Sequence, residues 1–327
     1  MTRRDFITLL GGAAAAWPLP GWAQQSPLPV IGWLGARAAH ESAYLVEAFR
    51  QGLKEAGFVE SQNVTVDFRW AEGDYDRLPA YAMELARRPV MVIVATGGDP
   101  AAQAAKAATT TIPVVFVSGS DPVKVGLVAS LNRPGGNITG IHLLLLGMGA
   151  KRLGLLHELI PAANPIGMLI NPNFADAQTQ LRDVEEAAKS LGLQLVVLKA
   201  RTELEINVAF QELVQRRIGA VLIGSDPFFT TRRGYLAALT VRHALPAMFD
   251  LREYVAAGGL MSYGASLADA YRQAGAYTGR ILKGEKPAEL PIIQSTKFDF
   301  VINLNIAKAF GLTLPPTLLA LADEVIE

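Results

Sequence analysis

Short, uninterrupted apolar runs alternate with amphipathic stretches along almost the whole chain, and this alternation constrains the fold more than any other feature. The runs are rich in Val, Ile and Leu and are too short for buried helices. Because they do not alternate with polar residues, they predict strands buried on both faces and helices packed against parallel sheets. The predicted strands are Val30–Leu34, Val64–Trp70, Val90–Ala95, Val114–Val117, Ile166–Ile170, Leu193–Leu198, Ala220–Ile223 and Ala247–Phe249, and the predicted helices are Tyr44–Ala56, Leu78–Arg88, Pro100–Thr109, Ala177–Leu191 and Glu205–Arg216.

This strand–helix pattern occurs twice in the sequence. With 327 residues, the chain is long enough for about two domains. The turn-rich stretch Asn132–Gly140 separates the two halves, and we interpret it as the first crossover between two lobes. Leu143–Leu146 is expected to be a buried or interlobe strand. The predicted fold class is therefore α/β, with two doubly wound parallel-sheet lobes.

The last third of the chain complicates a simple two-part division. Gly258–Gly264 and Phe298–Leu304 are extended and apolar, and the helix-like segment Leu267–Leu282 lies between them. If that helix packs on the first lobe, the chain crosses three times and its crossing strands form a hinge. Lobe 1 would then contain residues 28–138 and about 265–298, and lobe 2 residues 139–264 and about 299–327. A single crossover with a C-terminal subdomain is the alternative.

Residues 1–25 have the features of a secretory signal peptide. Arg3 and Arg4 precede the uncharged, apolar run Ile7–Trp17, and small residues precede a cleavage site after about Ala23. The paired arginines favour the twin-arginine route, although Sec signals also begin with basic residues. The apolar run is too short for a transmembrane helix. The sequence therefore predicts export to a bacterial periplasm.

The composition excludes several classes of function. The chain has 30 basic and 30 acidic residues and no cysteine. Balanced charge argues against nucleic-acid binding, and the absence of cysteine excludes disulfides, thiol nucleophiles and Cys-ligated metals. The four histidines are widely separated, and no GxGxxG, GxxxxGK[ST] or GxSxG motif occurs. We therefore expect a protein that is not an enzyme, with no catalytic residue, no cofactor and no metal.

Polar residues followed by proline stand directly after four of the predicted strands. Ligands of open α/β sheets bind beyond the carboxyl ends of the strands, and free N–H groups at helix starts favour anions. Small polar residues suit a ligand carboxylate, Asp226 suits an ammonium group, and the aromatic residues suit an apolar body. The candidate ligand-binding residues are Thr96, Gly97, Gly98, Asp99, Ser118, Ser120, Asp121, Asn171, Asp226, Phe228, Asp250 and Tyr263.

Simpler interpretations of these residues remain open. An Asp or Asn followed by Pro is also an ordinary helix N-cap, with no ligand involved. Trp33 and Tyr75 are typical packing residues, although the loop Gly35–His40 follows the first strand as a cleft loop would. Ser118 or Ser120 would be the nucleophile if the chain were a hydrolase, but no partner base is evident in the sequence.

The sequence resembles the periplasmic substrate-binding proteins of ABC transporters, in the group related to the tryptophan/tyrosine transporter binding components. The resemblance covers essentially the whole mature chain, and its most specific part is Arg133–Gly140. It extends to the following segments: Ala95–Ala102, Thr111–Phe116 with Ser120–Pro122, Gly126–Val128, Gly258–Gly264, and Asn303–Leu304 through Gly311–Pro316.

This resemblance implies the type I periplasmic-binding-protein fold and a solute captured between the lobes by hinge closure. It also implies that an acid binds the amino group of an amino-acid ligand, while hydroxyl and N–H groups at helix starts bind its carboxylate. Asp226 and the loop Ser120–Pro122 match such positions. Asp99 departs from the pattern, since some relatives have a small hydroxyl residue there, and the position of Asp250 is variable.

We therefore expect a periplasmic solute-binding component of an ABC importer. Its expected partners are a small carboxylate-bearing solute, such as an apolar or aromatic amino acid or an aromatic acid, and an ABC permease and ATPase. We expect it to be a monomer that does not bind nucleic acid. The alternatives are an exported α/β hydrolase or isomerase and a ligand-sensing protein that acts on a receptor.

Overall fold

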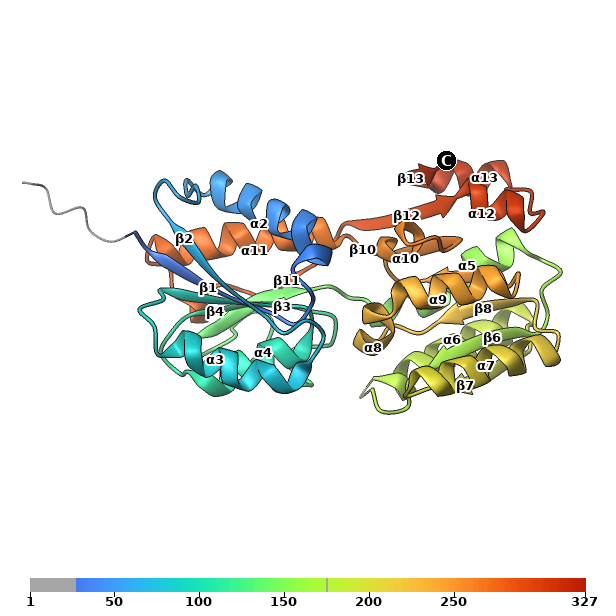
Figure 1. Ribbon diagram of the computed structural model, residues 1–327, viewed down its shortest axis with the longest axis horizontal. Helices are drawn as coiled ribbons and strands as arrows, with labels where there is room; N and C mark the ends of the chain where they lie inside the picture. Colours follow the sequence, from blue (N-terminus) through green and yellow to red (C-terminus); the bar gives the residue numbers. More distant parts are fainter. Residues whose placement is uncertain (1–27, 175) are drawn as a thin grey trace, which may run out of the picture.

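The apolar runs of the sequence form two separate β-sheets, each covered by helices on both faces (Figure 1). The computed structural model describes residues 28–174 and 176–327, so the predicted signal peptide lies outside the described residues. Within these ranges, no helix is both long and apolar enough to cross a membrane. The two-lobed α/β architecture agrees with the prediction from the sequence.

The first lobe contains a six-stranded, all-parallel sheet. Its inner strands are buried because helices cover both faces, whereas the edge strand β2 is half-buried. The strand order is β11 (Ile293–Gln294), β5 (Ile138–His142), β4 (Val114–Ser118), β3 (Val92–Thr96), β1 (Val30–Gly35) and β2 (Thr65–Trp70). Helices α2 (Ala43–Glu55) and α11 (Leu267–Leu282) cover one face, α3 (Leu78–Ala86) and α4 (Asp99–Ala108) cover the other, and the short turns are η1 (His40–Ser42), η2 (Tyr75–Arg77) and η4 (Pro287–Glu289).

The second lobe contains a seven-stranded sheet in which only the pairing of β12 with β10 is antiparallel. The strand order is β13 (Glu324–Ile326), β12 (Phe298–Asn303), β10 (Met261–Ala265), β9 (Ala247–Phe249), β8 (Ala220–Ile223), β6 (Ile166–Ile170) and β7 (Leu195–Lys199). The helical elements are η3 (Leu146–Met148), α5 (Gly149–Leu159), α6 (Ala177–Leu191), α7 (Glu203–Gln215), α8 (Pro227–Thr231), α9 (Arg233–Arg242), α10 (Arg252–Ala256), α12 (Leu304–Ala309) and α13 (Pro316–Leu321).

The chain passes between the two sheets three times. It leaves the first sheet after β5, returns from β10 to α11, which packs along α2, and leaves again between β11 and β12. The second and third passages are joined by a hydrogen bond from the Ser266 N–H to the Lys297 carbonyl (3.0 Å). The connection therefore has several segments side by side, while the exact bounds of the two lobes stay a prediction.

Two local predictions about the first connection are wrong. Residues 138–140, expected to belong to a crossover, begin β5, which pairs with β4. The Asn137 side-chain amide donates to the carbonyls of Thr109 (3.1 Å) and Ile112 (2.7 Å), so the turn before β5 is fixed to the first lobe. Leu143–Leu146 is not a strand, because it follows β5 and leads into η3.

Candidate functional site

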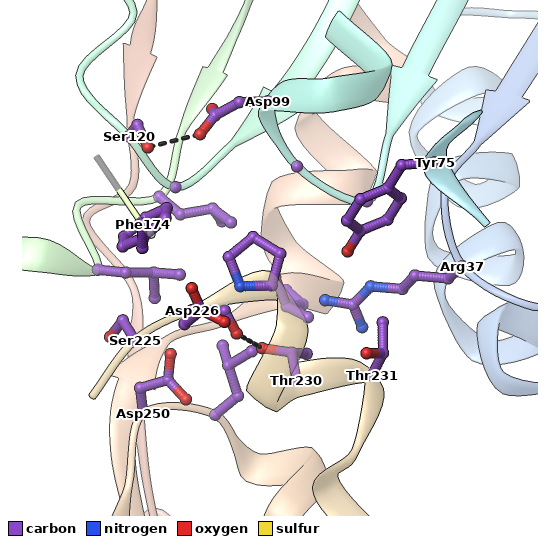
Figure 2. Close-up of a pocket in the computed structure, with 18 residues that line it drawn as sticks. Arg37, Tyr75, Asp99, Ser120, Phe174, Ser225, Asp226, Thr230, Thr231 and Asp250 are labelled. Atoms are coloured by element: carbon purple, nitrogen blue, oxygen red, sulfur yellow. Dashed lines mark hydrogen bonds between the residues drawn. The ribbon is translucent and has the colours of Figure 1, made fainter. Parts of the chain in front are cut away.

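A pocket lies between the two lobes, at the carboxyl ends of their parallel strands (Figure 2). Its walls enclose about 600 Å³, counted together with the solvent-open part of the space. Parallel sheets place the loops that follow their strands at one edge, which explains why loops distant in sequence meet here. The first lobe contributes Arg37, Tyr75, Gly97, Gly98, Asp99, Gly119 and Ser120, and the second contributes Phe174, Ser225, Asp226, Pro227, Thr230, Thr231, Asp250 and Leu251.

The helix after β3 begins one residue earlier than the sequence predicts, and Asp99 is not its N-cap. Gly97 and Gly98 both have positive φ (92° and 112°), and Gly98 is the N-cap of α4. Asp99, the first residue of that helix, accepts hydrogen bonds from the hydroxyls of Ser118 and Ser120. The two serine hydroxyls are therefore engaged by a carboxylate of the protein itself, and not by a histidine that could act as a base.

Asp226 lies on the opposite wall and caps α8. Its Oδ1 accepts from the Phe229 N–H (3.1 Å), and its Oδ2 accepts from the Asn171 side-chain amide (3.2 Å). Burial raises the pKa of Asp226, although these two donors oppose the shift. Both carboxylate oxygens thus have partners within the protein.

Asp250, the residue after β9, has a different environment. It is only 1% exposed, and neither of its carboxylate oxygens has a hydrogen-bond partner among the described residues. Burial raises the pKa of Asp250 to about 6, although the nearby charge of Arg152 and the neighbouring Ser225 hydroxyl oppose the shift. Figure 2 shows this carboxylate pointing towards the pocket.

Arg37 is a pocket residue that was not among the predicted ligand-binding residues. It follows β1, and Figure 2 shows its guanidinium pointing into the pocket next to Tyr75 and Thr231. Among the described residues, no carboxylate lies within 4.0 Å of this guanidinium. Burial opposes its charge, but Tyr271 and Glu253 raise the pKa of Arg37 overall. Its position after a strand end was the signal in the sequence.

The remaining predicted residues lie around the pocket or away from it. Asn171 and Phe228 line a neighbouring hollow that shares Tyr75 and Asp226 with the pocket. Thr96 and Ser118 are buried behind the pocket wall, and Asp121 accepts from the backbone N–H groups that follow it in its own loop. Tyr263 does not reach the pocket; its ring packs against Phe298 and Phe300.

The rest of the pocket lining is mainly apolar. Leu143 and Leu145 come from the segment between β5 and η3, Leu267 is the first residue of α11, and Leu251 and Phe174 come from the second lobe. Burial raises the pKa of Tyr75 to about 12, so its hydroxyl remains protonated at neutral pH. A few charged groups within an apolar lining are typical of a site for a small organic molecule. Within the described ranges, no three His, Cys, Asp or Glu side chains form a group suited to a metal.

Two polar contacts join the lobes beside the pocket. The Tyr44 hydroxyl, on α2, donates to the carboxylate of Glu253 on α10. Arg233 on α9 forms an ion pair with Glu41 of η1 (2.8 Å), and both side chains are largely buried. The two lobes are therefore in contact beside the pocket.

Comparisons with known proteins agree with this architecture. The family described as ABC transporter substrate binding protein matches residues 38–326. A tyrosine-binding protein of Clostridioides difficile (strain R20291) is 26% identical over 266 residues, which cover 81% of this chain and 76% of that protein.

Solved structures show the same similarity. An ABC domain from Streptococcus pneumonia in complex with L-Trp has a TM-score of 0.78 and 26% identity, over 90% of this chain and 100% of that one. A ligand-free, open substrate binding protein from Clostridium difficile has a TM-score of 0.71 and 25% identity, over 92% of this chain and 99% of that one. The predicted type I periplasmic-binding fold is thereby confirmed.

Proposed function

Because the chain belongs to the family of ABC transporter substrate binding proteins, we propose that it captures an L-amino acid with an apolar or aromatic side chain for an ABC importer. The observation that carries this proposal is the Arg37 guanidinium, which faces an interlobe pocket without a carboxylate partner among the described residues. A buried guanidinium is a strong binder of carboxylates because it donates two parallel hydrogen bonds. The α-carboxylate of the solute is that partner.

The apolar lining supports the choice of side chain. Leu143, Leu145, Leu251 and Leu267 surround the pocket with hydrocarbon, and Phe174 adds an aromatic ring. A relative is named as a tyrosine-binding protein, and a similar structure contains L-Trp. An aromatic amino acid would fill such a lining, with its charged groups at Arg37 and at the acids of the second lobe.

Capture follows from the division of the pocket between two lobes. A solute that touches both lobes gains all its contacts only in the closed state, so binding shifts the population towards closure. The interlobe contacts Tyr44–Glu253 and Arg233–Glu41 add to the stability of that state. No chemical step is required.

The cellular context is part of the same proposal. The signal peptide would direct the chain to the periplasm, with cleavage after about Ala23. There the closed, monomeric protein would deliver its solute to an ABC permease and ATPase. Loss of amino-acid uptake in cells that lack only this chain is the expected result, and unchanged uptake of every amino acid would contradict the importer role.

A thermal-shift screen of the mature protein tests the proposed solute. We expect stabilisation by one or more L-amino acids with apolar or aromatic side chains, and none by sugars. R37Q should lower the affinity about 30-fold or more, because the charge partner of the solute carboxylate is removed. R77Q is the matched control, since Arg77 is exposed outside the pocket. A screen in which no L-amino acid stabilises the protein would refute the proposal.

A further inference from the structure

Three acids line the pocket, and only one of them lacks hydrogen-bond partners. Asp99 accepts from Ser118 and Ser120, and Asp226 accepts from the Phe229 N–H and the Asn171 amide. Both oxygens of Asp250 are buried and have no partner among the described residues. The sequence favoured Asp226 for an ammonium group, but the hydrogen bonds leave Asp250 as the unsatisfied acid.

The position of Asp250 is fixed by the fold. Its main chain packs against Gly264 of β10, where a Cβ would lie only 1.8 Å from the Asp250 carbonyl oxygen. The nearby cation, Arg152, is fully buried, and it donates to Ser225 Oγ (2.9 Å) and to the Leu145 carbonyl (2.8 Å). Arg152 therefore raises the local positive potential without forming an ion pair with Asp250 within 4.0 Å.

Burying a carboxylate without a hydrogen-bond donor costs desolvation free energy, and a cationic donor is the partner that best offsets this cost. Asp250 lines the pocket, so such a donor can reach it from the pocket side. On the basis of the proposed function, we propose that Asp250 binds the cationic nitrogen of the solute. We further propose that the two unpartnered charges of the pocket, one on each lobe, restrict closure to solutes that carry both charges.

The two unpartnered charges, on Arg37 and Asp250, belong to different lobes. Arg37 follows β1 of the first sheet, and Asp250 follows β9 of the second. A carboxylic acid without an amine therefore pairs with Arg37 but leaves Asp250 buried and unsatisfied if the lobes close. A zwitterion satisfies both residues at once. The pocket thus selects amino acids over aromatic acids through closure as well as through affinity.

Isothermal titration with matched compounds tests the assignment. L-tryptophan and L-tyrosine are compared with their deaminated analogues, indole-3-propionate and 3-(4-hydroxyphenyl)propionate, on the wild-type protein, D250N and D226N. We expect D250N to weaken the amino acids about 30-fold or more and to leave the deaminated acids within about threefold. D226N is the matched control and should cause a clearly smaller loss, because asparagine also caps helices.

Small-angle X-ray scattering of the wild-type protein tests the closure without any variant. Starting from ligand-free protein, the amino acids should lower the radius of gyration, and saturating deaminated acids should not. Equal compaction by both kinds of compound, or equal losses in D250N and D226N, would overturn the proposal. Wild-type protein that binds no amino acid would refute the proposed function itself, so the two failures are distinguishable.

Discussion

Replacement of Asp250 by asparagine should make the ligand-free protein more stable. The pKa of Asp250 is raised from its ordinary 3.8 to about 6, mainly by burial and after the attraction of Arg152 is included. At about 1.4 kcal/mol per pKa unit, the ionised carboxylate costs the folded state about 3 kcal/mol relative to a neutral group. An asparagine side chain has nearly the same shape without the charge, so D250N should recover up to this amount at about pH 7.5.

The pH dependence of the stability difference between wild type and D250N distinguishes the buried charge from a general packing effect. The unfolded carboxyl group takes up its proton near pH 3.8, and the folded one near pH 6. Between these values the folded wild-type protein binds more protons than the unfolded chain, so its stability rises relative to D250N as the pH falls. The gap of about 3 kcal/mol at pH 7.5 should therefore narrow strongly by about pH 4.5.

Urea unfolding of ligand-free wild type and D250N, followed by circular dichroism at several pH values, measures this gap. Protein that has been unfolded and refolded provides the ligand-free sample. If D250N is less stable than wild type at pH 7.5, or if the gap does not change with pH, the carboxylate is not an unsatisfied buried charge. A stabilising variant that also loses amino-acid affinity would show that the site is maintained at a cost in stability.

Three further variants test other parts of the structure. Y44F removes the hydrogen bond to Glu253 across the cleft and should speed solute release about tenfold or more in stopped-flow experiments. The control Y235F loses a hydrogen bond within one lobe and should release the solute at the wild-type rate. Equal release rates in the two variants would contradict a closing role for Tyr44. R152M should lower the free energy of unfolding by about 3 kcal/mol or more, because it leaves Ser225 and the Leu145 carbonyl without their donor. A loss below about 1 kcal/mol in urea unfolding would contradict a structural role for the Arg152 hydrogen bonds. G264A should displace Asp250, whose carbonyl a new Cβ would overlap, and lower amino-acid affinity in titrations; unchanged affinity would show that the Asp250 backbone is not held there.

Elements with a clear sequence pattern could be predicted closely. The predicted and observed bounds of β6 and α6 coincide at Ile166–Ile170 and Ala177–Leu191. A wholly apolar short run fits only a buried strand here, and a regular amphipathic repeat fits only a helix with one face packed on the sheet. Asn132–Gly140 was harder, since its glycines and proline indicate a turn while its last residues pair with β4. That pairing depends on a neighbouring strand distant from the local sequence.

The candidate site shows a similar limit. The sequence predicts that Gly97, Asp99, Ser120, Asp226 and Asp250 lie near one another, because parallel strands end at a common edge, and all five line the pocket. Which acid lacks a partner cannot be predicted from the sequence, since that depends on the donors that each carboxylate meets in three dimensions.

Arg37 was missed for a related reason. Its loop contains no proline and therefore differs from the four strand-end loops that drew attention in the sequence. Tyr263 was placed near the ligand by its sequence context, but in the folded lobe its ring stacks on Phe298 instead. Which strand-end loops border the pocket can thus be predicted more readily than the direction in which their side chains point.

Arg37 in the interlobe pocket is the proposed binding partner for the carboxylate of a captured amino acid. The most direct measurement is a titration of wild type, R37Q and R77Q with L-tryptophan and L-tyrosine. We expect at least one of the two amino acids to bind the wild type and R77Q with equal affinity, and R37Q about 30-fold or more weakly. Equal affinity of all three proteins, or no binding to any of them, would contradict the claim.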